Sequence, residues 1–141
     1  MASVAFRCKM RGHQCVIITE DKDLWQCLGS GGVMYSSRNH EFRNEDWLYS
    51  GHHLKPEQVV DYLCMVGKDD SPSCRGIGDK HATDLLRKFG NFWEIYLSAA
   101  LDEKSPIPKK RRETILEFAR SGEYFTAHHL HTLVKNLEVK W

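Results

Sequence analysis

The spacing of apolar residues changes near residue 51, and this change constrains the fold more than any other feature of the sequence. Before it, Cys15-Val16-Ile17-Ile18-Thr19 is a short, mostly β-branched run flanked by polar residues, which predicts a buried strand. A helix is expected over residues 21–28, and residues 33–36 predict a second strand. Together with a short amphipathic helix over residues 2–11, this order predicts part of a parallel α/β sheet.

The sequence after residue 51 predicts only helices. Pro56 suits the first turn of a helix, and apolar residues follow it at helical spacing as far as Val66. Further helices are expected over residues 79–89, closed by Gly90, over 92–100 with Asn91 as the cap, over 109–119 and over 126–134. We therefore expect an α/β part over residues 1–51 and an all-helical part over residues 52–141.

Composition excludes several classes of protein. The 41% of hydrophobic residues excludes a disordered chain, and no apolar run approaches the ~18 residues of a membrane span. Five cysteines without C-x-x-C spacing argue against a disulfide framework or a zinc ribbon, so we expect a cytoplasmic protein with reduced thiols. The net charge of +1 hides an acidic middle, with −4 over residues 41–72 and +3 over residues 73–141.

Asp21 and Asp23 follow the expected strand over residues 15–19 at its carboxyl end. Ligands of parallel α/β sheets bind beyond this end of the strands, and two carboxylates there can hold Mg²⁺. Asp21 equally suits the N-cap of the helix that begins near Lys22. From these residues alone, a metal site and a simple helix cap both stay open.

A glycine-rich loop separates two of the expected helices. Gly76-Ile77-Gly78 gives a tight turn whose backbone can approach another surface closely, and Lys80 lies in the helix that follows. Amides at a helix start and a lysine side chain both suit a phosphate group. The pattern is that of a helix-hairpin-helix, which predicts DNA binding without sequence preference. The alternative is a connector whose glycines allow close packing.

Three further groups of residues have a structural explanation. The run Lys109-Lys110-Arg111-Arg112 is typical of a solvated helix face, and it is a second possible set of phosphate contacts. His128 and His131 share a helix face without a third ligand, so zinc is not expected there. Three tryptophans on apolar faces are expected in the core: Trp25, Trp47 and Trp93.

Four segments of the chain occur in an order typical of one family. They are ITEDKDLWQCL, LKPEQVVDYLCMVG, RGIGDKHATDLLRKFG and KKRRETILEFARSGEYFTAHHLHTLVKNLEV. Over nearly its whole length, the chain resembles the 5′-3′ exonuclease and flap-endonuclease family, in the bacterial DNA polymerase I 5′-nuclease branch. The resemblance covers only the later part of a family member, whose early metal-binding acids have no counterpart here. It implies the remnant of a parallel-sheet, PIN-like nuclease core, followed by a helix-three-turn-helix (helix-hairpin-helix) DNA-binding region.

The resemblance also assigns metal ligands. Asp21 and Asp23 match the family's metal-binding pair, and Asp69 falls on the second aspartate of its third acidic cluster. These three residues are expected to be catalytic and to hold Mg²⁺ or Mn²⁺. Lys68 departs from the pattern, because it stands where the family has the first aspartate of that cluster.

The DNA-binding residues come from the same resemblance. Gly76, Ile77, Gly78 and Lys80 match the loop with which the family grips the duplex backbone, often with a monovalent cation. We expect a structure-specific 5′-nuclease that hydrolyses phosphodiester bonds of DNA ends or branched duplexes. The expected partners are duplex or branched DNA and a separately encoded N-terminal nuclease half, with no membrane. The alternative is a DNA-binding module without catalytic activity.

Overall fold

The computed structural model describes residues 1–68, 70–135 and 137–138. Contacts within the chain form two units, of which unit 1 contains residues 1–59 and the segment from Thr132, and unit 2 contains Val60–His131. The division therefore lies near Val59, and the chain returns to unit 1 after the helices of unit 2. The domains predicted over residues 1–51 and 52–141 stay a prediction.

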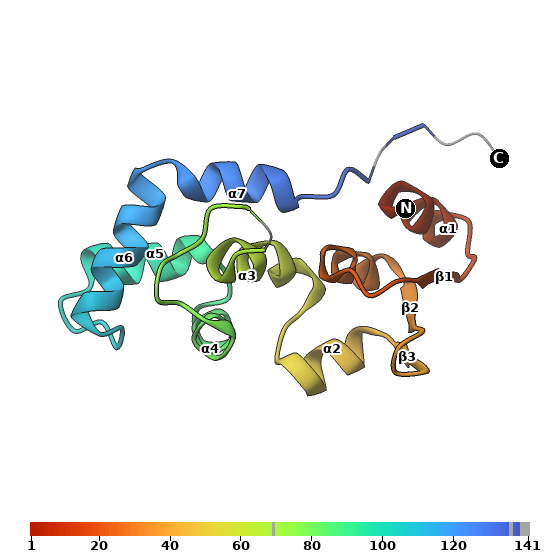
Figure 1. Ribbon diagram of the computed structural model, residues 1–141, viewed down its shortest axis with the longest axis horizontal. Helices are drawn as coiled ribbons and strands as arrows, with labels where there is room; N and C mark the ends of the chain where they lie inside the picture. The colour runs from red at the N-terminus through yellow and green to blue at the C-terminus, as the bar shows by residue number, and fades with distance from the viewer. Residues whose placement is uncertain (69, 136, 139–141) are drawn as a thin grey trace. The chain divides into compact units, whose positions relative to one another are not determined.

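Unit 1 combines a small sheet with helices. Its elements in chain order, drawn from red to yellow in Figure 1, are α1 (Ala2–Met10), β1 (Cys15–Ile18), η1 (Lys22–Ser30), β2 (Gly32–Ser36), β3 (Glu41–Arg43), α2 (Glu45–His52) and η2 (Pro56–Gln58). β1 and β2 are parallel, with Ile17 beside Met34, and η1 is the connection between them. The predicted parallel α/β arrangement is therefore confirmed for these two strands.

Three sequence predictions for unit 1 need correction. β3 pairs antiparallel with β2, and neither β3 nor α2 was predicted. The segment expected as a helix after Asp21 is a 3₁₀ helix, η1. β1 is not a buried strand, because it lies at the edge of the sheet and only Ile17 of its four residues is buried.

The core of unit 1 lies on one face of the sheet. Ile17 and Met34 point to this face, and η1 contributes Trp25, Cys27 and Leu28 to the buried residues. The Trp25 ring lies 4.6 Å from the His52 ring and 5.5 Å from the Trp47 ring, centroid to centroid. Trp25 is in the core as predicted, whereas Trp47 is half-buried.

Unit 2 consists of helices. They are α3 (Val59–Val66), whose first residue belongs to unit 1, and α4 (Asp79–Phe89), α5 (Phe92–Leu101), α6 (Lys109–Arg120) and α7 (Glu123–His131), drawn from green to blue in Figure 1. α4 has the predicted bounds and ends at Gly90, and the Asn91 side chain caps α5 by accepting a hydrogen bond from the Glu94 amide. α7 begins and ends three residues before the predicted 126–134, directly after Gly122.

Aromatic packing joins the helices of unit 2. The Phe92 ring stacks on the Tyr124 ring at 4.0 Å, and both side chains are buried. Asp61 of α3 ties these residues together, since it accepts hydrogen bonds from the Phe92 amide at 2.9 Å and from the Tyr124 hydroxyl at 2.8 Å. The prediction that Trp93 is a core residue is wrong, because 42% of its surface is exposed beside Phe125.

None of the described helices has the length and apolar composition that crossing a membrane requires.

Candidate functional site

The predicted acidic pair lies directly beyond the carboxyl end of β1. The Asp21 carboxylate accepts a hydrogen bond from the Asp23 amide at 3.1 Å, and Asp21 is the N-cap of η1. The Asp21 amide in turn donates to the Thr19 hydroxyl at 3.0 Å. Asp21 is exposed and Asp23 is half-buried. The prediction that Asp21 caps a helix is therefore correct, and both aspartates lie directly beyond the carboxyl end of β1, where ligands of parallel strands bind.

Glu20 precedes this pair and has a structural role. Its carboxylate accepts hydrogen bonds from the Ser36 hydroxyl at 2.6 Å and from the Arg38 amide at 3.1 Å, and it pairs with Arg43 at 3.3 Å. The hydrogen bond from Ser36, then the one from the Arg38 amide, lowers the pKa of Glu20 below its ordinary value. Glu20 thus fixes the end of β1 to the end of β2 and holds the chain from which Asp21 projects.

The two aspartates fit a hard divalent cation by their chemistry. Carboxylate oxygens are the ligands that Mg²⁺ and Mn²⁺ prefer. Within the described residues, no group of three or more His, Cys, Asp and Glu side chains is arranged to hold a metal. Asp69, the third predicted ligand, lies outside the described residues.

The predicted glycine loop connects α3 to α4 in unit 2. Gly76 has φ +76°, a left-handed conformation that glycine adopts without strain. Ile77 anchors the loop, because its side chain is 4% exposed and its amide donates to the Cys74 carbonyl at 3.1 Å. Gly78 is the N-cap residue of α4 and provides no side chain to its amides, and both Gly78 and Lys80 are exposed.

Open space surrounds both glycines of this loop. A Cβ atom built on Gly76 or Gly78 would meet no described atom within 4 Å. Packing inside the chain therefore does not require glycine at position 78, where φ is −94°. An exposed backbone that is anchored by a buried side chain allows a binding partner to approach closely. A loop that only connected two packed helices would not require this open space.

The basic run at the start of α6 divides into two pairs. Lys109 and Lys110 are exposed, whereas Arg111 and Arg112 are half-buried. The Arg111 guanidinium donates a hydrogen bond to Nε2 of His81, and Arg112 donates to the Asp102 carbonyl at 3.3 Å. Only the two lysines are thus presented as a solvated face, and the two arginines join α6 to neighbouring segments.

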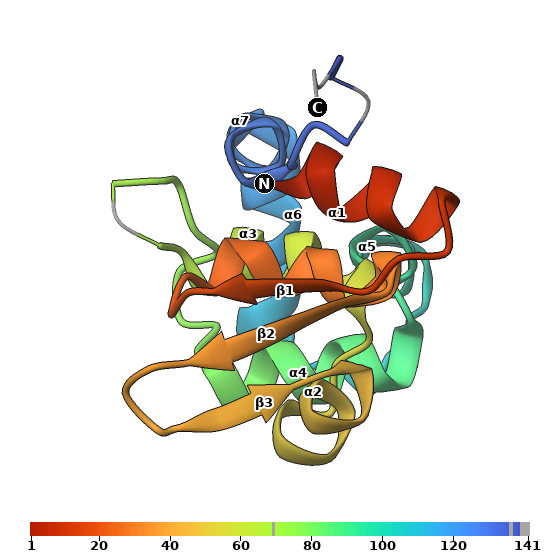
Figure 2. The ribbon, with the colours of Figure 1, turned by 90° about the vertical axis from the view of Figure 1, so that its right-hand side faces the viewer.

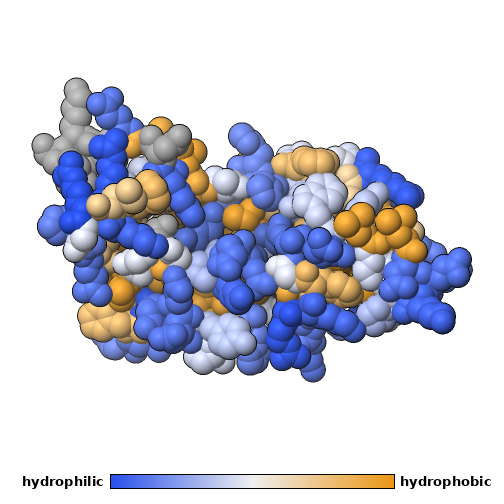
Figure 3. All heavy atoms as spheres, turned by 180° about the vertical axis from the view of Figure 1, so that it is seen from behind, coloured by the Kyte–Doolittle hydropathy of each residue, from blue (hydrophilic) through white to orange (hydrophobic). Residues whose placement is uncertain are grey.

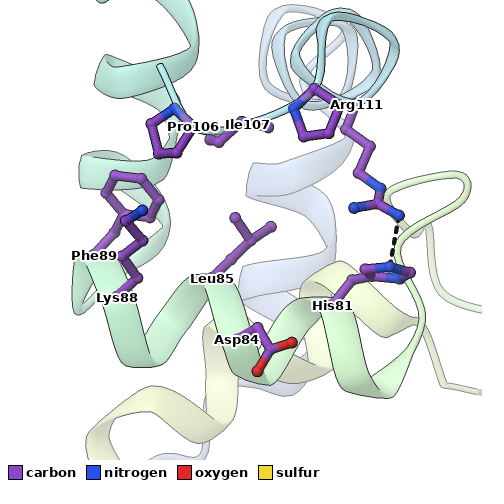
Figure 4. A pocket seen from close by; sticks show the side chains of 9 residues that line it. His81, Asp84, Leu85, Lys88, Phe89, Pro106, Ile107 and Arg111 are labelled. Carbon is purple, nitrogen blue, oxygen red and sulfur yellow. Dashed lines mark hydrogen bonds between the residues drawn. The ribbon is translucent and has the colours of Figure 1, made fainter. Parts of the chain in front are cut away.

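A pocket of about 160 Å³ lies beside the Arg111–His81 contact (Figure 4). Leu85 and Phe89 of α4 and Pro106 and Ile107 of the segment before α6 give it apolar walls. His81 and Arg111 close one end of it in Figure 4. Sequence reasoning missed His81, although its position directly after Lys80 places it in the first turn of α4.

Comparison with known proteins starts from the fold. The chain superposes on the 5′-exonuclease of bacteriophage T5, solved with bound divalent zinc ions, with a TM-score of 0.70 over 92% of this chain and 48% of the other, at 22% identity. A flap endonuclease of the same phage, in a pseudo-enzyme–product complex with DNA and metal ions, also gives a TM-score of 0.70 at 20% identity, over 92% of this chain and 47% of the other. The helix-rich α/β fold is therefore that of the 5′-exonucleases.

Sequence relatives specify the family. The thermostable DNA polymerase I of Thermus thermophilus is 30% identical over 119 residues, which are 83% of this chain and 14% of the polymerase. The flap endonuclease Xni of Salmonella paratyphi B is 32% identical over 120 residues, which are 84% of this chain and 47% of that enzyme. No protein-family model matches the chain. The chain belongs to the 5′-3′ exonuclease and flap-endonuclease family, as its motifs predicted. It spans about half of Xni's length and far less of the polymerase's.

Proposed function

We propose that this chain forms part of a metal-dependent 5′-nuclease that hydrolyses phosphodiester bonds in DNA ends or branched duplexes. The observation that carries the proposal is the pair Asp21 and Asp23 beyond the end of β1, in a fold shared with 5′-exonucleases. Asp21 and Asp23 would hold a divalent ion such as Mg²⁺ or Mn²⁺ through their carboxylate oxygens. An ion at such ligands activates water and stabilises charge that develops on a phosphate.

The residues around the pair contribute rigidity. Glu20 is held by Ser36, Arg38 and Arg43, which fixes the backbone from which Asp21 starts. The Asp23 amide donates a hydrogen bond to the Asp21 carboxylate, and this bond orients that carboxylate. A substrate phosphate that meets this pair would therefore encounter an Asp21 carboxylate whose position is set by a hydrogen bond. The contribution of Asp69 stays a prediction from the sequence.

The second part of the proposal concerns DNA binding by unit 2. The amides at the start of α4, the exposed backbone at Gly78 and the ammonium group of Lys80 form a surface suited to a phosphate of the duplex backbone. Lys109 and Lys110 add two exposed positive charges on α6. A monovalent cation at the Gly76–Gly78 loop stays a prediction of the family resemblance.

A non-catalytic DNA-binding module is the second candidate. It is favoured by the described residues, which gather fewer than three potential ligands at the acidic pair.

Cleavage of a 5′-flap DNA in Mg²⁺ distinguishes the two candidates. The nuclease proposal predicts products with the wild-type chain and none with Asp21→Asn, which keeps an N-cap residue but removes one negative charge. Duplex binding without cleavage by the wild-type chain would show that this chain acts by itself as a DNA-binding module.

Binding is measured separately, in EDTA. Gly78→Ala should weaken duplex binding, since its methyl group occupies the space that a phosphate backbone would enter. Lys80→Ala should weaken binding to all sequences alike. It should also reduce the slope of the logarithm of the binding constant against the logarithm of the salt concentration by about one. The matched control is Lys88→Ala, because Lys88 is exposed on the same helix two turns further on. Equal losses for Lys80 and Lys88 would contradict the assignment of the loop.

A further inference from the structure

The pocket beside the Arg111–His81 contact is formed entirely by residues of unit 2. It lies between α4, the start of α6 and the segment over residues 106–108 that precedes α6. The strands of unit 1, which Figure 2 shows as β1 to β3, contribute none of the described residues that line it. We call this cavity the α4–α6 pocket.

The walls of the α4–α6 pocket are apolar. Figure 4 shows the Leu85 side chain pointing from α4 towards Pro106 and Ile107, and Phe89 lies one turn further along α4. The volume is about 160 Å³, and a cavity of roughly this size accepts one benzene-sized ring. The pocket therefore has room for a single aromatic side chain.

Two cations lie at the ends of this apolar pocket. The Arg111 guanidinium and His81 close one end, and Lys88 lies at the other (Figure 4). Among the described residues, neither Arg111 nor Lys88 forms an ion pair with a carboxylate. Asp84 also borders the pocket, but its carboxylate pairs with Arg87 at 3.8 Å. The pocket thus presents positive charge on both sides of an apolar centre.

The bond to His81 holds the Arg111 guanidinium without neutralising its charge. Nε2 of His81 accepts this bond, so the partner is a nitrogen lone pair and not a carboxylate. A guanidinium has five N–H donors, and a carboxylate can accept two of them in parallel. Lys109 and Lys110 are exposed directly before Arg111 and add positive charge in the same part of α6. This end of the pocket therefore suits a carboxylate from a binding partner.

A concave apolar site differs from an ordinary apolar patch on a surface. On the face of the molecule in Figure 3, apolar side chains form separate patches between hydrophilic ones, which is normal for a protein surface. A hollow with apolar walls and a few charged groups around it is typical of a binding pocket.

The apolar walls favour a peptide over a nucleotide as the occupant. A nucleobase carries nitrogen and oxygen atoms around its edge, and Leu85, Phe89 and Ile107 offer their side chains as walls without hydrogen-bond partners. The ring of a phenylalanine has no polar atoms and loses no hydrogen bonds on entering such a space. The charges at the two ends then require carboxylates on both sides of that ring.

We propose that the α4–α6 pocket binds an acidic peptide segment of another protein, in which one aromatic side chain stands between acidic residues. The ring fills the space between Leu85 and Ile107, and the neighbouring carboxylates pair with Arg111 and Lys88. The occupant follows from charge complementarity together with the volume and the apolar walls. The proposal goes beyond the proposed nuclease, since it requires neither the metal site nor DNA binding.

The test follows the backbone amides of the isotope-labelled full chain by NMR, without DNA or metal. The probe is a short glutamate peptide with one central phenylalanine. We expect shifts at the amides around the pocket, with Leu85 and Ile107 among them, and weaker binding as the salt concentration rises. The same peptide with serine in place of phenylalanine should bind roughly tenfold more weakly.

Variants of the cations locate the site. Arg111→Gln should weaken peptide binding roughly tenfold, and Lys88→Ala, at an exposed position, roughly threefold. The matched control is Lys80→Ala, since Lys80 is exposed on the same helix outside the pocket and should not affect peptide binding. Lys88→Ala should in turn leave duplex binding unchanged. An unchanged Tm verifies that each variant is folded.

The other outcomes overturn the proposal. If the phenylalanine and serine peptides bind alike, the surface recognises charge alone and the pocket has no role. If the shifts map to another part of the chain, or no peptide binds, the pocket is not a peptide site. If an oligothymidylate binds the pocket more tightly than the peptide, the occupant is nucleic acid. These measurements contain no DNA duplex, so they stand whether or not the chain proves to bind or cleave DNA.

Discussion

The Tyr62 hydroxyl donates a hydrogen bond to the carboxylate of Asp79, and this bond joins α3 to the first residue of α4. It spans the glycine loop from one side to the other. Burial, and then the hydrogen bond to Asp79, raises the pKa of Tyr62 above its ordinary value. The loop is therefore held in place by a polar contact between the two helices that it connects.

Tyr62→Phe should remove this contact with little change in volume. We expect a loss of about 1 kcal/mol in the free energy of unfolding, since Asp79 is exposed and regains water as a partner. Because the pKa of Tyr62 is raised in the folded state, its contribution is complete below pH 10 and is lost as the pH rises further. Urea unfolding at pH 7 and pH 10.5 measures both effects. A difference between wild type and variant that grows with pH would contradict this account.

The two loop glycines should respond differently to alanine. Gly76→Ala should cost about 1–2 kcal/mol, because a side chain is strained at φ +76°. Gly78→Ala should cost less, about 0.5–1 kcal/mol, since its φ is −94° and its surroundings are open, and only the poorer capping by alanine counts against it. Thermal unfolding of both variants checks the prediction. Equal destabilisation would indicate that Gly78 has a packing role.

Substitutions of Asp21 separate its role as a cap from its charge. Asp21→Ala removes the acceptor of the Asp23 amide and should cost about 1 kcal/mol. Asp21→Asn retains an acceptor and should preserve stability. Both variants should lose affinity for Mn²⁺ in a titration calorimeter if the carboxylate is a ligand. Retention of Mn²⁺ binding by Asp21→Asn would exclude Asp21 as a charged ligand.

The charge of Glu20 should stabilise unit 1 only above its pKa. Since hydrogen bonds lower that pKa in the folded state, the stabilisation is present above the ordinary value of 4.5 and disappears as the pH falls below it. Glu20→Gln should therefore lower the Tm at pH 7, and the difference from wild type should shrink as the pH falls below 4.5. Glu103→Gln, in an exposed segment of unit 2, serves as the control and should have little effect at either pH. An effect of Glu20→Gln that is independent of pH would indicate a purely steric role.

The five cysteines should differ in reactivity with iodoacetamide at pH 8. Burial raises the pKa of Cys64 and of Cys74 to about 12, and it raises that of Cys27 too. Cys8 and Cys15 are both half-buried, but burial raises the pKa of Cys15. Cys8 should therefore react first. Mass spectrometry of the native protein should find the three buried thiols unmodified, and urea should expose all five. Rapid native labelling of Cys64 would show that α3 opens readily.

The sequence predicts an element correctly where its local signals, such as apolar spacing and flanking glycines, agree with the packing in the fold. α4 could be predicted to the residue because its apolar spacing is regular and glycines flank it at positions 78 and 90. β3 could not, because its buried residue is Arg43, whose charge is paired with Glu41 at 3.0 Å. A hydrophobic pattern cannot reveal a strand whose inward side chain is charged. Asn44 and the two acids that follow it are an N-terminal signal for α2, but Gly51 interrupts the helical pattern near its other end.

The candidate site shows the same limit. Asp21 and Gly76–Gly78 could be predicted as candidate site residues from the sequence, because each belongs to a local motif. The bond between Arg111 and His81 was not, because thirty residues separate the two side chains. The exposure of Ile18 also depends on which element covers the sheet, and a run of β-branched residues looks alike on covered and uncovered faces.

Because the chain returns to unit 1 after unit 2, unit 1 cannot finish folding during synthesis until unit 2 has been translated. The Ser3 hydroxyl donates to the Val134 carbonyl at 2.9 Å, and the Leu133 amide donates to Gln26 at 3.4 Å. Unit 2 is a continuous stretch, whereas these contacts of unit 1 need residues that are translated after it. On the ribosome, α1 and η1 must therefore wait for the whole helical unit to emerge before their last neighbours arrive.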